Sequence, residues 1–203
     1  MPIVQRLKAE LDDTFRSFRI FQVIIASICI SLPALLVWAD HNKPNASTMP
    51  FRESISAYVH IERSYIFGML MCMAAMLFIV NGVVYFKNQD TRLKLESTGK
   101  WYNMILGISL LGVILFVHDE LRTLHIIFAT IFFLGNAVVT GIFHHGVRKR
   151  LSLTLALLTV AAFAIHLIDD SLITMFWAEW FSLVVIAIHL ILQGIKVMAL
   201  SRK

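Results

Sequence analysis

Charged residues are scarce in this sequence, and long polar stretches are almost absent. Asp, Glu, Lys and Arg make up only 15% of the 203 residues, whereas soluble proteins usually contain about a quarter. Hydrophobic residues make up 58%, and the mean hydropathy is +0.76. A soluble domain of this length could not bury so much apolar surface. The composition therefore excludes an ordinary soluble enzyme or binding domain and indicates an integral membrane protein.

Cysteine is also scarce, and the known zinc signatures are missing. Cys29 and Cys72 both lie within apolar stretches, so they form neither a disulfide framework nor a CxxC metal pair. The HExxH pattern of zinc hydrolases does not occur. We interpret the two cysteines as small packing residues.

Six apolar stretches account for most of the chain, and each is close to the about 20 residues that a helix needs to cross a bilayer. Lipid cannot satisfy exposed backbone groups, so helices are expected rather than strands. The predicted fold is all-α, a six-transmembrane-helix bundle forming one integral membrane domain over residues 1–203. A polar, amphipathic segment at 1–19 is predicted to be a separate interfacial helix. The expected spans are about 20–38, 64–86, 101–117, 124–143, 151–168 and 176–195, with a long outer loop at 39–63.

The net charge of +5 is explained by membrane topology rather than by nucleic-acid binding. Most of the 18 Lys and Arg residues fall in four segments that alternate with the outer loops: 1–19, 87–100, 144–150 and 196–203. An excess of Lys and Arg marks cytoplasmic segments. We therefore expect a multi-pass membrane protein with both termini in the cytoplasm and no nucleic-acid partner. A homo-oligomer and a partner membrane protein both remain open.

Ionisable side chains gather on the predicted outer side of the membrane. Glu179 lies about one turn inside the last span, where an ionisable group is energetically unfavourable and by default indicates a functional site. Short outer turns bring further acidic, basic and histidine residues to the same side. This outer polar cluster comprises His60, Glu62, Arg63, His118, Asp119, Glu120, Arg122, His125, His166, Asp169, Asp170 and Glu179.

Three interpretations of the outer polar cluster remain open. In the first, Arg63 and Arg122 form structural ion pairs with its acidic members. In the second, the cluster holds a lipid headgroup and needs no cofactor. In the third, zinc is the cofactor of a hydrolase, polarising a lipid ester or amide carbonyl and activating water. The candidate metal ligands of this third interpretation are His118, His125, His166, Asp169 and Glu179.

Two short motifs resemble those of known membrane proteins. Glu53-Ser-Ile-Ser-Ala-Tyr58 and Phe176-Trp-Ala-Glu179 resemble a SISAY motif and an FW-x-E motif of uncharacterised bacterial membrane proteins. The layout over about 51–196 is also similar to the eukaryotic Frag/DRAM/Sfk family of six-span membrane proteins, with His125 opening the fourth span and Glu179-Trp180 in the sixth.

The Frag/DRAM/Sfk family is tied to GPI-anchor remodelling, autophagy modulation and phosphoinositide signalling, so the resemblance implies a lipid-facing role. The positions that it marks as a shared lipid-binding site are Ser54, Ser56, Tyr58, Arg63, His125 and Glu179.

The preferred hypothesis is a non-enzymatic multi-pass membrane protein that binds or senses a lipid headgroup at the outer leaflet. The first alternative is the membrane-embedded, metal-dependent hydrolase of a lipid ester or amide. The second is a transporter or channel subunit in which Glu179 carries a proton, although paired broken helices and an inverted repeat are missing. Whether the protein is an enzyme is therefore an open question at the level of sequence.

Overall fold

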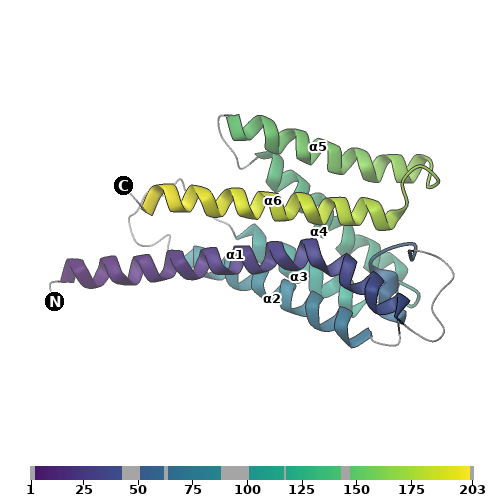
Figure 1. Ribbon diagram of the computed structural model, residues 1–203, viewed down its shortest axis with the longest axis horizontal. Coiled ribbons are helices and arrows are strands. Elements are labelled where there is room, and N and C mark those ends of the chain that lie inside the picture. The colour runs from purple at the N-terminus through teal and green to yellow at the C-terminus, as the bar shows by residue number, and fades with distance from the viewer. Residues whose placement is uncertain are drawn as a thin grey trace.

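The computed structural model describes the backbone of residues 3–42, 51–61, 64–87, 101–116, 118–142 and 147–201. Side chains are described within residues 20–42, 51–61, 64–83, 101–116, 118–142 and 149–192. All regular elements in these ranges are helices, which confirms the all-α prediction (Figure 1). They are α1 (Ile3–His41), η1 (Ser56–His60, a 3-10 helix), α2 (Ser64–Lys87), α3 (Tyr102–Leu115), α4 (Arg122–Ile142), α5 (Val147–Ile168) and α6 (Met175–Ser201).

Five helices of the described chain are long and apolar enough to cross a membrane, which makes this a membrane protein by helix length and composition. Large apolar side chains on these helices are exposed, such as Met69 on α2 and Leu157 on α5, as contact with lipid requires. The helix α3 has 14 residues and is about 21 Å long at 1.5 Å per residue, shorter than the expected span. The five candidate spans are Ile20–His41, Ser64–Val83, Arg122–Ile142, Lys149–Ile168 and Met175–Leu192.

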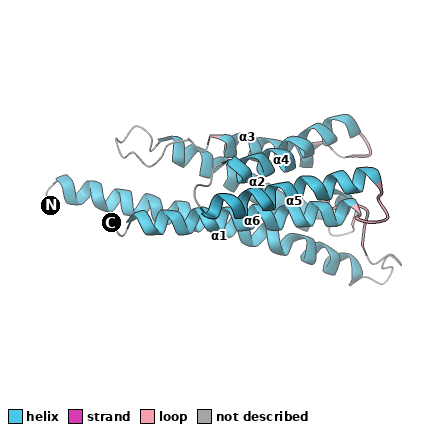
Figure 2. Cartoon of the chain, turned by 90° about the horizontal axis from the view of Figure 1, so that it is seen from above, coloured by secondary structure: helices cyan, strands magenta, loops and turns pink. Residues whose placement is uncertain are grey.

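The first helix is longer than predicted. α1 runs without a break from Ile3 to His41, so the separate interfacial helix expected over 1–19 is instead the first part of the helix that continues into the span. Pro33 lies inside α1 and does not end it. Helices in bilayers tolerate proline because neighbouring groups satisfy the freed carbonyl. The partner along this helix is α6, which lies beside α1 in both views (Figures 1 and 2).

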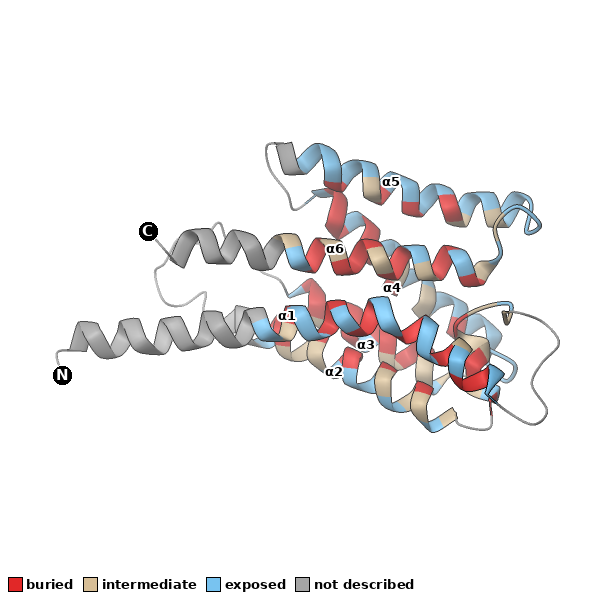
Figure 3. Ribbon diagram, viewed as in Figure 1, coloured by how far each residue is buried: buried red, intermediate tan, exposed pale blue. Residues whose placement is uncertain are grey.

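The helices α2, α3 and α4 pack in sequence order against one another. The Phe116 ring at the end of α3 stacks on Phe128 of α4 with centroids 5.4 Å apart. Phe78 of α2 and Phe132 of α4 meet edge to face with centroids 5.8 Å apart. The tight link at 118–121 therefore joins an antiparallel helix pair. By contrast, α5 lies at the edge of the bundle, and its outer face is largely exposed (Figure 3).

Three connecting segments gather at one end of the bundle, opposite the start of α1 and the end of α6 (Figure 1). They are residues 51–61 before α2, the turn at 118–121 between α3 and α4, and the turn at 169–174 between α5 and α6. We call this end the loop end. Residues from all three segments line one cavity there, so six described members of the outer polar cluster meet at the loop end: His60, His118, Asp119, Arg122, His166 and Asp170. Glu62 and Arg63 fall outside the described residues.

Candidate functional site

The segment 51–61 follows a three-residue pattern. Ile55, Tyr58 and Ile61 are all buried, and residues three apart share a face of a 3-10 helix. The backbone N–H of Tyr58 donates to the carbonyl of Ile55, and that of Ile61 donates to the carbonyl of Tyr58. Ser54 and Ser56 are only partly buried, and their hydroxyl oxygens lie 3.0 Å apart. The SISAY motif therefore buries Ile55 and Tyr58 and leaves its two serines partly exposed.

Two hydrogen bonds fix this segment to the first turns of α6. The backbone N–H of Ile55 donates to Oε2 of Glu179 at 2.6 Å. The backbone N–H of Phe176 donates to the carbonyl of Glu53 at 2.8 Å. Glu179 is only 7% exposed, and buried polar groups require such partners. The residue that the sequence marked as functional thus holds the serine segment against the last helix.

Aromatic rings reinforce the same contact. Phe51 stacks on Phe176 with ring centroids 5.2 Å apart and meets Trp177 edge to face at 5.1 Å. Tyr58 lies 5.9 Å from Phe176. Offset and edge-to-face ring pairs contribute about 0.5–1.5 kcal/mol each beyond simple burial. The FW-x-E motif of α6 and the SISAY motif are therefore two halves of one packing unit.

An ion pair ties the segment to the end of α1. Nε and Nη2 of Arg52 donate to the two carboxylate oxygens of Asp40 at 2.8 and 3.1 Å, a bidentate geometry. These bonds raise the pKa of Arg52 above its ordinary value, so it stays charged. The guanidinium also lies 5.7 Å from the centroid of the Tyr58 ring. Burial raises the pKa of the Tyr58 phenol, and Tyr58 does not line either of the two cavities described below.

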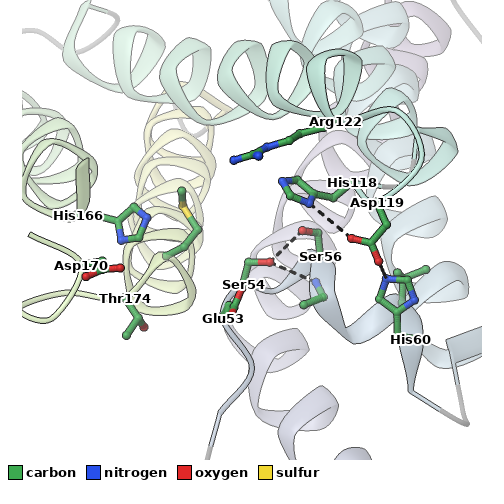
Figure 4. A pocket seen from close by; sticks show the side chains of 13 residues that line it. Glu53, Ser54, Ser56, His60, His118, Asp119, Arg122, His166, Asp170 and Thr174 are labelled. Atoms are coloured by element: carbon green, nitrogen blue, oxygen red, sulfur yellow. Dashed lines mark hydrogen bonds and ion pairs between the residues drawn. The ribbon is translucent and has the colours of Figure 1, made fainter. Parts of the chain in front are cut away.

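A polar cavity of about 500 Å³ opens beside the serines (Figure 4). Across it, Oδ2 of Asp119 lies 3.0 Å from Nε2 of His60, and Oδ1 lies 3.6 Å from Nδ1 of His118. Solvent reaches all three side chains, so these pairs are weakened by screening. The lining residues are Glu53, Ser54, Ser56, Ala57, Val59, His60, His118, Asp119, Arg122, His166, Asp170, Thr174 and Met175.

An apolar cavity of about 620 Å³ adjoins the polar one, between α4, α5 and α6. This volume lies within the range of about 300–1,000 Å³ that is usual for ligand pockets. The residues that line both cavities are Ser54, Ser56, His118, Arg122, His166 and Met175. The remaining walls of the apolar cavity are His125, Ile126, Ala129, Thr130, Phe133, Leu134, Ala137, Thr159, Val160, Phe163, Ala164, Leu167 and Glu179.

Arg122 is the arginine that the two cavities share, beside His118 and His166. It stands at the first residue of α4 and points across the mouth of the polar cavity (Figure 4). Among the described side chains no carboxylate forms an ion pair with it, and Asp119 is paired with histidines instead. The structural pairing expected for Arg122 is therefore not seen in this part of the chain, and its guanidinium faces the cavity.

Two histidines present one ring nitrogen each for a ligand. Nδ1 of His125 lies 2.8 Å from the carbonyl oxygen of Phe116, and Nδ1 of His166 lies 3.0 Å from that of Ile173. A carbonyl oxygen only accepts, so Nδ1 carries the hydrogen in both rings and Nε2 is left for a further partner. The rings of His118 and His125 converge edge to face with centroids 5.5 Å apart.

The five candidate metal ligands do not form one centre. Among the described residues, no three His, Cys, Asp or Glu side chains are close enough to hold a metal ion. The helix α5 ends at Ile168, and the carboxylate of Asp169 is engaged by the turn that follows the helix. Its Oδ1 accepts the hydroxyl and the backbone N–H of Ser171 at 2.6 and 3.0 Å. These bonds lower the pKa of Asp169.

The structure brings four of the six predicted lipid-binding residues together: Ser54, Ser56, His125 and Glu179 line the apolar cavity. Tyr58 lies behind this wall, and Arg63 falls outside the described residues. Arg122 was missed as a site residue. Its place at the start of a span, directly after a tight turn and between two histidines, is the sequence signal that could have identified it.

A family model described as a family of unknown function (DUF7103) matches residues 31–194, a range that contains both cavities. No curated protein and no solved structure matches the chain.

Proposed function

The chain belongs to the family of unknown function DUF7103, and we propose that it binds a membrane lipid in the two adjoining cavities. The observation that carries this proposal is the set of six residues shared by a polar and an apolar cavity. A molecule with one polar and one apolar end fills both spaces at once. A small polar solute would leave the apolar walls without a partner, and burial of apolar surface is the main source of binding free energy.

The polar cavity favours an anionic headgroup. Arg122 offers a guanidinium whose planar donors match phosphate oxygens in charge and geometry. The hydroxyls of Ser54 and Ser56 lie on the same cavity wall and are bonded to each other, so one of the two hydroxyls remains able to donate to a phosphate oxygen. The headgroup is therefore a phosphate ester, held between α4 and the serine segment that Glu179 positions.

We also propose that α3 crosses the bilayer, which makes six spans. Both α2 and α4 begin at the loop end, so the chain has to return to that end between them, and α3 is the described helix that leads back. Local thinning of the bilayer accommodates a short span at modest energetic cost. Lys149 and Arg150 are exposed at the opposite end, beside the start of α5. By the positive-inside rule the termini are then cytoplasmic, and the cavities face the outer leaflet.

The resemblance to the Frag/DRAM/Sfk family supports the same proposal. Two of the residues that carry it, His125 and Glu179, line the apolar cavity. Lipid-related roles in that family therefore agree with the chemistry of the walls in this chain.

The test compares Arg122→Gln with Arg150→Gln after purification in a mild detergent. Arg150 is exposed at the end remote from the cavities, so its variant is a matched loss of one positive charge. Bound phospholipid is counted by native mass spectrometry. A charge-assisted hydrogen bond contributes about 1.5–3 kcal/mol, so Arg122→Gln should weaken retention about tenfold or more while Arg150→Gln retains the lipid. Equal retention by Arg122→Gln and the unchanged chain would contradict the proposal.

A further inference from the structure

The walls of the apolar cavity include side chains that are themselves exposed on the surface of the bundle. Leu134 on α4 is 48% exposed, and Val160 and Leu167 on α5 are 43% and 81% exposed, yet all three line the cavity. They lie within candidate membrane spans. A cavity wall built from exposed span residues adjoins the hydrocarbon of the bilayer directly.

The packing of α4 against α5 differs along their length. Far from the loop end, a Cβ added to Gly141 would lie 3.4 Å from the Cβ of Ala156, so the backbones approach closely there. Toward the loop end, the cavity separates residues 126–137 of α4 from residues 159–167 of α5. The two helices are therefore in close contact near Gly141, and the cavity lies between them nearer the end that carries Arg122.

An aromatic contact crosses the cavity. The rings of Phe133 and Phe163 meet with centroids 5.4 Å apart. The hydroxyl of Thr159 donates to the carbonyl of Leu155 within its own helix, so it presents no free donor to the cavity. α5 also has the smallest buried share of the five candidate spans, 22%. These features suit an occupant that is apolar, flexible and supplied from the lipid phase.

We propose that α4 and α5 form a lateral portal through which one acyl chain of an outer-leaflet phospholipid enters the apolar cavity. This inference rests on the proposed lipid-binding function and adds the class of lipid and its route. Lateral entry keeps the chain in apolar surroundings throughout, while the phosphate moves only along the headgroup region to Arg122. A free phosphate could reach Arg122 as well, but it would leave the cavity between α4 and α5 unfilled.

The portal is tested on the full chain in nanodiscs of phosphatidylcholine that contain phosphatidylglycerol with a diazirine at the end of one acyl chain. After illumination, cross-linked peptides are mapped by mass spectrometry. Labels are expected on Thr130–Leu134 and Val160–Ala164, and excess unlabelled phosphatidylglycerol should reduce them at least fivefold. Labels on exposed residues of α2 such as Met69 report ordinary surrounding lipid and should not be reduced by this competition. Labelling of α4 and α5 that resists the competitor, or that inorganic phosphate alone removes, would overturn the portal.

A pair of variants gives an independent test. Ala164 is exposed and lines the cavity, whereas Ala161 is exposed on the same helix and does not. Ala164→Trp should lower about tenfold the cross-linking that unlabelled phosphatidylglycerol competes for. Ala161→Trp adds the same bulk and should leave this cross-linking unchanged. Thermal unfolding of both variants shows whether the fold is kept. If Ala164→Trp does not fold, the cross-link map of the unchanged chain decides whether the portal is supported or overturned.

The two proposals fail in different ways. If Arg122→Gln loses phosphatidylglycerol while Ala164→Trp binds and cross-links normally, the headgroup site is supported and the portal is overturned. If Ala164→Trp blocks labelling while Arg122→Gln does not change retention, the portal is supported and the phosphate assignment to Arg122 is overturned.

Discussion

Oε2 of Glu179 accepts the backbone N–H of Ile55 at 2.6 Å, although the two residues are 124 positions apart in the sequence. This bond explains why an ionisable residue stands in the first turns of an apolar helix. The N–H of Ile55 lies where the serine segment crosses the start of α6, and it has no other acceptor in a helix or strand. Glu179 therefore acts on the cavity by placing Ser54 and Ser56 on its wall.

Substitutions of Glu179 should lower the free energy of unfolding, and the loss should be larger when no acceptor remains for the N–H of Ile55. Glu179→Ala leaves the buried N–H of Ile55 without a partner, which costs about 1–3 kcal/mol. Glu179→Gln keeps an amide oxygen as acceptor and should lose less than half as much. Thermal unfolding in detergent measures the difference. Glu120→Ala, in the exposed turn before α4, is the control and should unfold like the unchanged chain. Equal losses for Glu179→Ala and Glu179→Gln would show that the hydrogen bond to Ile55 is not the cause.

The ion pair of Arg52 with Asp40 should show strong coupling in a double-mutant cycle. Asp40 is 5% exposed, so removing Arg52 leaves a buried carboxylate with fewer donors, and such losses reach several kcal/mol. Residues in direct contact typically couple by about 0.5–3 kcal/mol. The cycle uses Arg52→Gln, Asp40→Asn and the double variant, with free energies of unfolding from chemical denaturation.

Arg52→Lys adds a check on the bidentate geometry of that pair. An ammonium group cannot donate two parallel hydrogen bonds to the carboxylate. We therefore expect Arg52→Lys to be nearly as destabilising as Arg52→Gln. Stability close to that of the unchanged chain would mean that charge alone accounts for the interaction.

Alkaline pH should weaken the loop end through Tyr58. Burial raises the pKa of its phenol above the ordinary value of 10.0, so the folded chain keeps a proton that the unfolded chain releases. The stabilisation is complete below about pH 10 and is lost as pH rises toward the folded pKa. Unfolding midpoints between pH 8 and about 11 should fall more steeply for the unchanged chain than for Tyr58→Phe, which has no proton to lose. Parallel curves for the two proteins would assign the alkaline loss to other groups.

The sequence could predict which stretches are helices and roughly where they lie. An apolar stretch of this length satisfies its backbone groups in lipid only as a helix. Five expected spans lie within helices of adequate length. The continuous helix α1 was missed because the amphipathic pattern of residues 1–19 indicates only which side of a helix faces solvent. Such a pattern does not indicate where the helix ends. The shortness of α3 was missed because the apolar run also includes Trp101 and Phe116, which lie outside the helix.

Side-chain direction in the loop end could not be predicted in the same way. The serines of the SISAY motif line both cavities. Tyr58 was expected beside them, but the 3-10 geometry turns it to the buried face with Ile55 and Ile61. A sequence pattern of five residues does not distinguish a 3-10 helix from a loop, and the partner of Glu179 is too distant in sequence for any local pattern to identify it.

Two glycines within helices should respond in opposite ways to the same substitution. At Gly107 of α3, an added Cβ would lie 2.7 Å from the carbonyl oxygen of Ala75 and 2.7 Å from Cγ1 of Ile79. The backbone of α2 has to move to relieve this, and such overpacking costs about 1–3 kcal/mol. At Gly68 of α2 nothing lies within 4 Å of the added atom, so Gly68→Ala should stabilise by up to about 1 kcal/mol through helix propensity. Unfolding midpoints of Gly107→Ala and Gly68→Ala should therefore move to opposite sides of the unchanged chain. A rise for both would mean that α3 does not pack on α2 as closely as the glycine geometry requires.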